Sequence, residues 1–301
     1  MTNRTERNFT FISHLSNSTL KGPLLMLAAA LAFAILDGLL KVMGPAYRVW
    51  DLAFLRWGGS LALLIIIFGR QGQLFKTDNL KLMIIRSITG CITFLLLIAA
   101  IRSIPLSTAM VLFFTFPAFA VLFSIILFGE RLSKLQILCI SGTLAGVAVL
   151  LDIELTHDFA GAALALMSAV FAGFTVCLIK KLRDNNGPVV IYLYFCLLGA
   201  AVSFPMFIAH PVIPESGKEW LMAVGIACTA VSGQLLMNQG FKYCKSWEGS
   251  MYLSAEVVFT AILGIVFLGE LINWHFWTGG ILILLSVISL QLTTARQMSG
   301  A

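Results

Sequence analysis

Asp37 and Lys41 are ionisable side chains inside an apolar stretch, residues 24–44, that is long enough to cross a lipid bilayer. They are four positions apart, so a helix carries both on one face. An ionised side chain at the centre of a bilayer costs roughly 2.5–3.5 kcal/mol on insertion scales, so such groups normally face a partner or water. Two interpretations follow: an ion pair within the helix, with Lys41 reaching outward, or an Asp37 that lines a substrate path or exchanges protons. We favour the second.

Glu256 is a second carboxylate inside an apolar run, Ser250–Glu270, and Tyr252 lies one turn before it. A carboxylate in hydrocarbon can bind a cationic group, or stay protonated until a water-filled cavity opens. The alternative is a structural contact with Lys41 or Arg86. We expect Glu256 to face a central cavity.

Four more polar residues lie within apolar segments. Arg86 is about one turn inside its segment, where a long side chain can reach the headgroups or attract an anion at a cavity mouth. Gln234 and Asn238 share a helix face and need hydrogen-bond partners, either on another helix or on a substrate. Arg56 follows Asp51 by five residues, and we expect it to be structural.

The sequence lacks the motifs of the common enzyme classes. There is no G-x-x-x-x-G-K-[ST] nucleotide loop and no H-E-x-x-H metal motif. The 4 histidines lie outside or at the ends of the apolar segments, and the 6 cysteines are scattered singly, as small buried hydrophobes are. We therefore expect no cofactor, no metal site and no enzymatic activity. A channel is harder to exclude, although no carbonyl filter or charged ring is visible.

The composition is that of a membrane protein. Only 11% of the residues are charged and 59% are hydrophobic, against about a quarter charged in soluble domains. The net charge of +6 is spread over short loops without a basic patch, which argues against nucleic-acid binding. Charges, prolines and glycines divide the chain into ten expected helices: 24–44, 52–68, 82–101, 106–128, 135–151, 161–179, 189–208, 220–240, 249–268 and 276–293.

The positions of Lys and Arg predict the orientation of the chain in the membrane. Most of the 20 basic residues fall in the loops on the side that holds the N-terminus. The excess of positive charge marks the cytoplasmic side. Both termini are therefore predicted to be cytoplasmic, in a multi-pass protein of the inner membrane, which agrees with an even number of helices.

The chain contains an internal repeat. Residues 110–130 and 250–270 share Phe, Ile, Gly and Glu at equivalent places, and in each case one further apolar segment follows. Five helices per copy is an odd number, so the second copy enters the membrane from the opposite face. In this alignment Phe116 is the partner of Glu256, and we expect it to face the same interior.

The repeat predicts the organisation of the chain. We expect a cytoplasmic tail at 1–21, one five-helix repeat at 22–155, a second at 156–295 and a short cytoplasmic tail at 296–301. In the fifth expected helix, Gly142-x-x-x-Gly146 allows close helix approach, and a homodimer contact there is one hypothesis.

The motifs resemble those of the EamA-type branch of the drug/metabolite transporter superfamily, from Lys21 to Thr294. Matching features are Phe128-Gly129-Glu130 and Leu268-Gly269-Glu270 at equivalent helix ends, Arg56, Arg86, Ile104-Pro105 and Pro117. Asp37-x-x-x-Lys41 and Tyr252–Glu256 resemble a subgroup that includes metabolite, S-adenosylmethionine and riboflavin carriers. The sequence departs from the family pattern at Cys139 and Ser286, where Gly is usual, and at Val257, where many members have Pro.

Together, the residues and the resemblance imply an all-α integral membrane protein with ten transmembrane helices in two inverted five-helix repeats. The expected function is secondary transport of a small polar or amphipathic metabolite by alternating access, and a channel or a non-transporting membrane enzyme is the alternative. Lys41 and Arg86 would receive a carboxylate, while Asp37 and Glu256 would receive an amine or a coupling proton. The residues expected to line the cavity are Asp37, Lys41, Arg86, Phe116, Gln234, Asn238, Tyr252 and Glu256.

Overall fold

The fold was obtained as a computed structural model of the chain. The structure describes residues 3–43, 47–70, 75–103, 109, 112–129, 133–150 and 159–268, with short pieces between 274 and 289. The described helices are α1 (Asn3–Met43), α2 (Val49–Phe68), α3 (Leu80–Ser103), α5 (Phe116–Phe128), α6 (Lys134–Leu150), α7 (Phe159–Leu182), α8 (Pro188–Ala209), α9 (Gly217–Gly240), α10 (Ser246–Leu253) and α11 (Ala255–Leu268).

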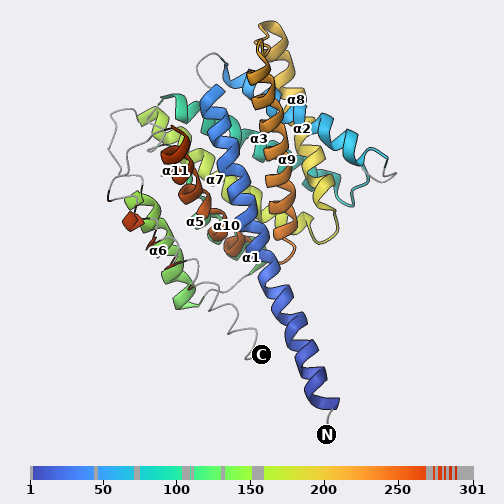
Figure 1. The fold of residues 1–301 in the computed structure, drawn as a ribbon, viewed down its shortest axis with the longest axis vertical. Helices are drawn as coiled ribbons and strands as arrows, with labels where there is room; N and C mark the ends of the chain where they lie inside the picture. The colour runs from blue at the N-terminus through green and yellow to red at the C-terminus, as the bar shows by residue number, and fades with distance from the viewer. Residues whose placement is uncertain are drawn as a thin grey trace.

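Most of these helices are long and apolar enough to cross a bilayer. Among the described residues, 6 candidate spans lie in α1, α2, α3, α7, α8 and α9, and two shorter apolar helices lie in α5 and α6. Figure 1 shows them as a bundle, with α1 running its length and continuing beyond it toward the N-terminus. The expected tenth helix, 276–293, lies largely outside the described residues.

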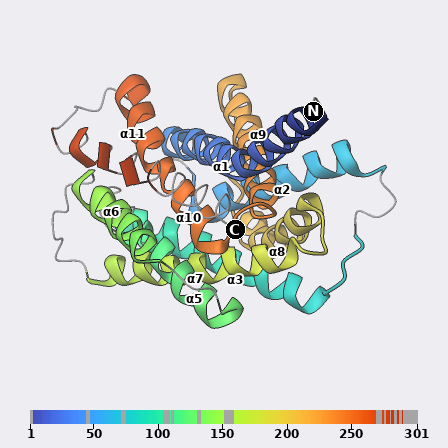
Figure 2. The ribbon, with the colours of Figure 1, turned by 90° about the horizontal axis from the view of Figure 1, so that it is seen from below.

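The helices pack into two groups, which we name after their central members. The α1 group consists of α1 with α9, α10 and α11, and the α7 group consists of α7 with α3 and α5. Seen along the bundle in Figure 2, the two groups lie on opposite sides. Helices α2 and α8 pack on each other between them, α2 also against α9 and α8 also against α3.

The packing repeats itself within the chain. The first-repeat helices α1, α2, α3 and α5 correspond, in this order, to α7, α8, α9 and α10–α11 of the second repeat. Under this correspondence, the contact between α1 and α9 is equivalent to the contact between α7 and α3. In the same way, the contact of α2 with α9 becomes that of α8 with α3. The fold is therefore a two-repeat membrane fold, and each packed group takes helices from both repeats.

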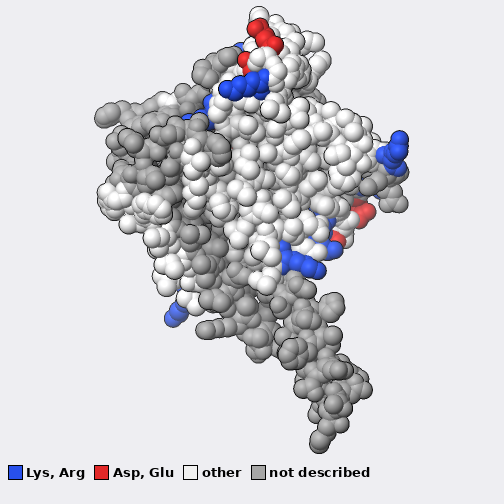
Figure 3. Space-filling model, in the orientation of Figure 1, with Lys and Arg blue, Asp and Glu red and all other residues white. Residues whose placement is uncertain are grey.

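The surface of the bundle is apolar. Large hydrophobic side chains point outward along it, and Ile66 and Leu221 are 76% and 72% exposed. Figure 3 shows a broad uncharged surface over the middle of the bundle, with charged side chains at the top, along the lower edge and at the right-hand edge. Such a surface needs lipid as its solvent, so the chain is a multi-pass membrane protein.

Helix α1 begins far earlier than the expected start at residue 24. It runs from Asn3, and the apolar part suitable for the membrane is Leu20–Met43. Hydropathy marks only the part of a helix that suits lipid, whereas backbone hydrogen bonds can continue through a polar sequence.

Two of the expected helices are interrupted. The region 106–128 has a turn at Phe114 and Thr115 before α5, and the region 249–268 has a break at Ser254 between α10 and α11. The breaks lie at equivalent places in the two repeats. Pro117 was expected to bend its helix, but it lies in the first turn of α5, where its missing N–H removes no helical hydrogen bond.

Candidate functional site

Asp37 and Glu256 meet inside the α1 group. Asp37 lies on the side of α1 opposite the exposed Leu24, Leu31 and Ile35, so it faces the protein interior and not lipid. Its carboxyl group lies within hydrogen-bonding reach of that of Glu256 on α11. A hydrogen bond between two carboxyl groups needs a proton on one of them. Both side chains are half-buried.

Arg56 on α2 lies near this carboxyl pair and acts electrostatically on both of its members. Its guanidinium stacks on the ring of Phe94, 4.3 Å from the ring centroid. Arg56 is 9% exposed, and its Nε has no hydrogen-bond partner among the described residues. The sequence suggested a structural role for Arg56; its depth in the bundle places it at the centre of the site.

Arg86 on α3 lies beyond Arg56, within its electrostatic range, and is only 1% exposed. Its guanidinium stacks on Phe195 of α8 at 4.3 Å and donates a hydrogen bond from Nη2 to Gln234 Oε1 at 3.2 Å. Its Nε and Nη1 have no partner in the described part of the chain. Arg86 is therefore not a residue that reaches the headgroups, which was one of the two interpretations of its sequence position.

An aromatic cluster holds the two arginines in place. Trp57 is fully buried and packs edge-on against Phe94 and Phe195, with ring centroids 5.1 and 5.7 Å apart. Gly199 leaves room for the indole: a Cβ built at this glycine would lie 2.3 Å from the Trp57 ring. The packed rings thus fix the orientation of the two guanidinium groups that stack on them.

Phe116 and Tyr252 form an apolar part of the same interior. Both are buried in the main core cluster, and Phe116 packs against Phe113 and Phe114 with centroids 5.4 and 6.0 Å apart. The Tyr252 hydroxyl has no hydrogen-bond partner among the described residues. Because the polar tip of a buried tyrosine normally finds a partner, this hydroxyl is available to a guest molecule.

Gln234 and Asn238 have different surroundings despite sharing a helix face. Gln234 accepts the hydrogen bond from Arg86, so it belongs to the centre of the site. Asn238 donates from Nδ2 to the Pro188 carbonyl at 3.1 Å, which joins α9 to the start of α8. This contact agrees with the helix-bonding interpretation of Asn238, although its Oδ1 has no partner in the described part of the structure.

Lys41 is exposed, whereas Asp37 is half-buried. Lys41 lies one turn after Asp37 near the end of α1. The groups that act on Asp37 in the interior are Glu256 and Arg56, both from other helices. Sequence spacing pairs Asp37 with Lys41 on its own helix, and it could not reveal these partners.

Arg183, which the sequence analysis did not single out, ties the α7–α8 connection to the end of α9. Its Nε donates to the Asn238 carbonyl at 2.9 Å, its Nη2 donates to Gln239 Oε1 at 2.7 Å, and its Nη1 donates to the Asn186 carbonyl. Partial burial lowers the pKa of the guanidinium. Its place in a basic loop resembled an ordinary orientation signal, so no sequence feature separated it from Lys180 and Lys181.

The opposite end of the bundle has a comparable arginine contact. Arg48 pairs with Asp51 in the first turn of α2 at 2.8 Å and donates to the Met206 and His210 carbonyls at the end of α8. The hydrogen bond to Asp51 raises the pKa of Arg48. Beside it, the Tyr47 hydroxyl donates to Glu219 Oε2 at 3.2 Å. Desolvation, followed by this hydrogen bond, raises the pKa of Tyr47.

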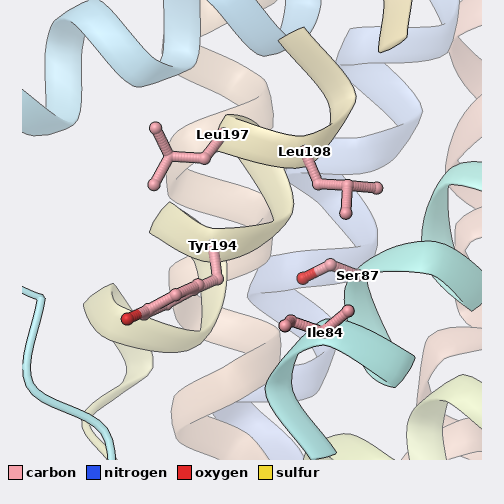
Figure 4. A pocket seen from close by; sticks show the side chains of 5 residues that line it. All are labelled: Ile84, Ser87, Tyr194, Leu197 and Leu198. Carbon is pink, nitrogen blue, oxygen red and sulfur yellow. The ribbon is translucent and has the colours of Figure 1, made fainter. Parts of the chain in front are cut away.

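A separate hollow of about 270 Å³ lies between α3 and α8 (Figure 4). Its lining residues are Ile84, Ser87, Tyr194, Leu197 and Leu198. The lining is nearly all apolar and contains none of the ionisable groups of the central site. Among the described residues, no group of three or more His, Cys, Asp or Glu could hold a metal ion.

Several known proteins resemble this chain over most of its length. The pseudopaline exporter CntI of Pseudomonas aeruginosa (strain UCBPP-PA14) is 24% identical over 273 residues, 90% of this chain and 96% of that protein. The riboflavin transporter of Vibrio cholerae is 22% identical, over 89% of this chain and 92% of its own. Human solute carrier family 35 member G1 is 22% identical, over 71% of this chain and 62% of its own.

A solved crystal structure has the same fold, with a TM-score of 0.79 at 21% identity over 91% of this chain and 98% of its own. The profile of the EamA-like transporter family matches the chain twice, at residues 20–152 and 159–291. The named relatives are transporters, so the resemblance points to transport and not to an enzyme. With both copies of the family profile found in it, the chain belongs to the EamA-like transporter family of the drug/metabolite transporter superfamily.

Proposed function

We propose that the protein is a secondary carrier that moves a small polar or amphipathic metabolite across the inner membrane by alternating access. The proposed architecture is ten transmembrane helices in two inverted repeats, 22–155 and 156–295, with tails 1–21 and 296–301 in the cytoplasm. The observation that carries the proposal is the Asp37–Glu256 carboxyl pair, which joins the first repeat to the second deep in the bundle. Inverted repeats of carriers place substrate sites in such positions.

The carboxyl pair suits a cationic cargo group or a coupling proton. Two carboxyl groups that share a proton can exchange it for an ammonium group, and the net charge of the site is then the same with the proton as with the ammonium group. Tyr252 and Phe116 would contact the apolar part of the cargo, and Lys41 would lie at the exposed mouth near the end of α1. An amino acid or S-adenosylmethionine has the required ammonium group.

The arrangement of the groups supports a particular motion. The α1 group carries Asp37 and Glu256, whereas the α7 group carries Arg86 and Phe116. Rocking of one group against the other would change the distance between these side chains and open the site to each side in turn. The moving bodies would therefore be the packed groups and not the sequence repeats.

The named relatives support transport but not one substrate. One is called a pseudopaline exporter and another a riboflavin transporter, and each is less than 25% identical to this chain. The gradient and the coupling ion decide between uptake and export in such a fold, so the proposal covers both directions.

Reconstitution into liposomes tests the function. A carrier gives saturable counterflow of a metabolite from a screened library, whereas an ohmic current would indicate a channel and chemical conversion of the compound would indicate an enzyme. We expect Glu256→Gln to reduce counterflow by about tenfold or more, since a hydrogen bond to a charged group contributes roughly 1.5–3 kcal/mol. Asp184→Asn, in an exposed loop, is the control and should transport normally. Wild-type flux in folded Glu256→Gln protein at every pH would contradict the role of Glu256.

A further inference from the structure

Among the described residues, neither of the two arginines at the centre of the bundle, Arg56 and Arg86, forms an ion pair. In the part of the chain that the structure describes, neither guanidinium lies within 4.0 Å of a carboxylate. Each instead stacks on a phenylalanine, and each influences the other as a like charge. Two buried cations in this condition are unfavourable unless an anion joins them.

The titratable groups nearest to Arg86 do not supply that anion. Arg86 lies close to the thiols of Cys91 and Cys196 and to the hydroxyl of Tyr192. The Tyr192 hydroxyl donates to Ser60 Oγ at 2.9 Å, and both thiols are buried. These groups are neutral at ordinary pH. The Asp37–Glu256 pair beside Arg56, when it shares one proton, carries one negative charge against the two positive charges of the arginines, so one positive charge is left unbalanced.

The unused donors of the pair match a carboxylate. Arg86 keeps Nε and Nη1 without partners among the described residues, while its Nη2 is held by Gln234, and Arg56 keeps Nε without a partner there. A carboxylate has two oxygens that accept from a guanidinium in bidentate fashion. Gly90 allows Phe195 and Arg86 to approach α3 closely, since a Cβ there would lie 3.0 Å from the Phe195 ring and 3.2 Å from Arg86 Nη1.

We propose that Arg56 and Arg86 form a carboxylate subsite of the transport site, with Gln234 as the residue that positions Arg86. The proposal rests on the carrier function and specifies its substrate class. Arg56 is within electrostatic range of both the Asp37–Glu256 pair and Arg86, whereas Arg86 is not among the charges that act on the acids. The cargo therefore carries an ammonium group for the acids and a carboxylate for the arginines. Because Arg86 belongs to the α7 group and the acids belong to the α1 group, such a cargo bridges the two moving bodies.

The transport test compares acids with their amides. For each amino-acid-like compound that gives counterflow with the wild type, the matching carboxamide, which lacks the negative charge, is measured as a competitor. We expect the acid to compete about tenfold or more better than the amide in the wild type, and Arg86→Gln to remove this preference. Glu256→Gln should lower binding of both compounds and keep the preference between them.

The stability test separates a binding arginine from a structural one. Without cargo, Arg86→Met removes an unpaired buried charge, so its melting temperature should be equal to or above that of the wild type. Arg183→Met is the matched contrast, because Arg183 donates to three protein acceptors, and its melting temperature should fall.

The outcomes of these tests distinguish failure of the carboxylate subsite from failure of the carrier function. Equal competition by acids and amides in a protein that shows saturable counterflow would overturn the subsite and leave the carrier function standing. A fall in melting temperature for Arg86→Met as large as that for Arg183→Met would make Arg86 structural and would also overturn the subsite. Stabilisation of the wild type by sodium chloride equal to that by a carboxylic acid at the same ionic strength would assign the arginines to an inorganic anion and overturn it too. Absence of counterflow for every compound would count against the carrier function itself.

Discussion

The charged residues of this protein derive their roles from what surrounds them more than from their places in the sequence. Arg86 and Arg183 are both buried arginines, but Arg183 fills its donors with backbone and amide oxygens, whereas Arg86 leaves two donor atoms unfilled among the described residues. A satisfied guanidinium stabilises a connection, and an unsatisfied one is suited to a ligand that comes and goes. Among the acids, Asp51 is paired with Arg48 at the end of the bundle, whereas Asp37 and Glu256 lie beside each other in the interior.

A prediction at the residue scale concerns the room made for Trp57. We expect Gly199→Ala to destabilise the protein by about 1–3 kcal/mol, because the added Cβ meets the indole at 2.3 Å in a site where the aromatic rings are fully packed. The fall in melting temperature in detergent measures it.

Gly38→Ala is the control for this change. Gly38 also lies within a helix, but a Cβ added there meets no atom within 4 Å, so alanine should leave stability unchanged or raise it by up to about 1 kcal/mol. If both alanine variants had the same melting temperature, the close approach of α8 to Trp57 would not be a constraint on the fold.

At the scale of helices, sequence and structure agree where apolar length decides and differ where it does not. The spans in α2, α3, α7, α8 and α9 agree with their expected ranges to within a few residues, because a long apolar run has few alternatives to a membrane helix. The break at Ser254 was not predicted, since apolar residues flank it on both sides. In the first repeat a bend was expected at Pro117, and the break lies just before it, at Phe114 and Thr115.

The central site was only partly predictable for the same physical reason. Asp37, Glu256, Arg86 and Gln234 were expected to lie in the interior, because ionisable groups and amides in hydrocarbon must find partners. The position of Arg56 at the centre of the site was not expected, because its partners lie on other helices. Local sequence spacing does not show how helices pack on one another. Gly142 illustrates this as well: a Cβ there would lie 2.5 Å from Ser286 Oγ of the same chain, so the close approach at this glycine already serves a contact within the chain, and a dimer through it stays a prediction.

The two helix breaks lead to a prediction at the element scale. Val257 lies in the first turn of α11 at the place equivalent to Pro117 of α5, and its N–H donates only to Ser254 at 3.2 Å in a turn. We therefore expect Val257→Pro to fold and insert, with a modest loss of stability. Ile262→Pro, farther along α11 and exposed to lipid, should cost about 3 kcal/mol or more.

The measurement for this pair is the amount and melting temperature of monodisperse protein after extraction in detergent. Burial does not explain the expected difference, since Val257 is the more buried of the two positions. Equal loss of folded protein in the two variants would mean that α10 and α11 behave as one continuous helix, and the break would have no mechanical significance.

For the whole molecule, the arginine contacts that join different helices lie at opposite ends of the bundle. At one end, predicted to be external, Arg48 at the start of α2 donates to carbonyls at the end of α8, and Phe54 stacks on Phe207 with centroids 4.4 Å apart. At the other end, Arg183 and Asn238 join the α7–α8 connection to α9. A carrier that opens to each side in turn must loosen one of these ends while it keeps the other.

Hydrogen–deuterium exchange can follow the two ends separately. We expect Arg183→Met to raise exchange of backbone amides at the end of α9 and in the α7–α8 connection, with little change at the start of α2, because it removes three hydrogen bonds at one end only. Arg48→Met should do the reverse and raise exchange at the start of α2 and the end of α8. If both variants loosened the same segments, or if each loosened the whole bundle equally, the two ends would not act as independent closures. The packed groups would then have to exchange access by a motion other than rocking about the central charges.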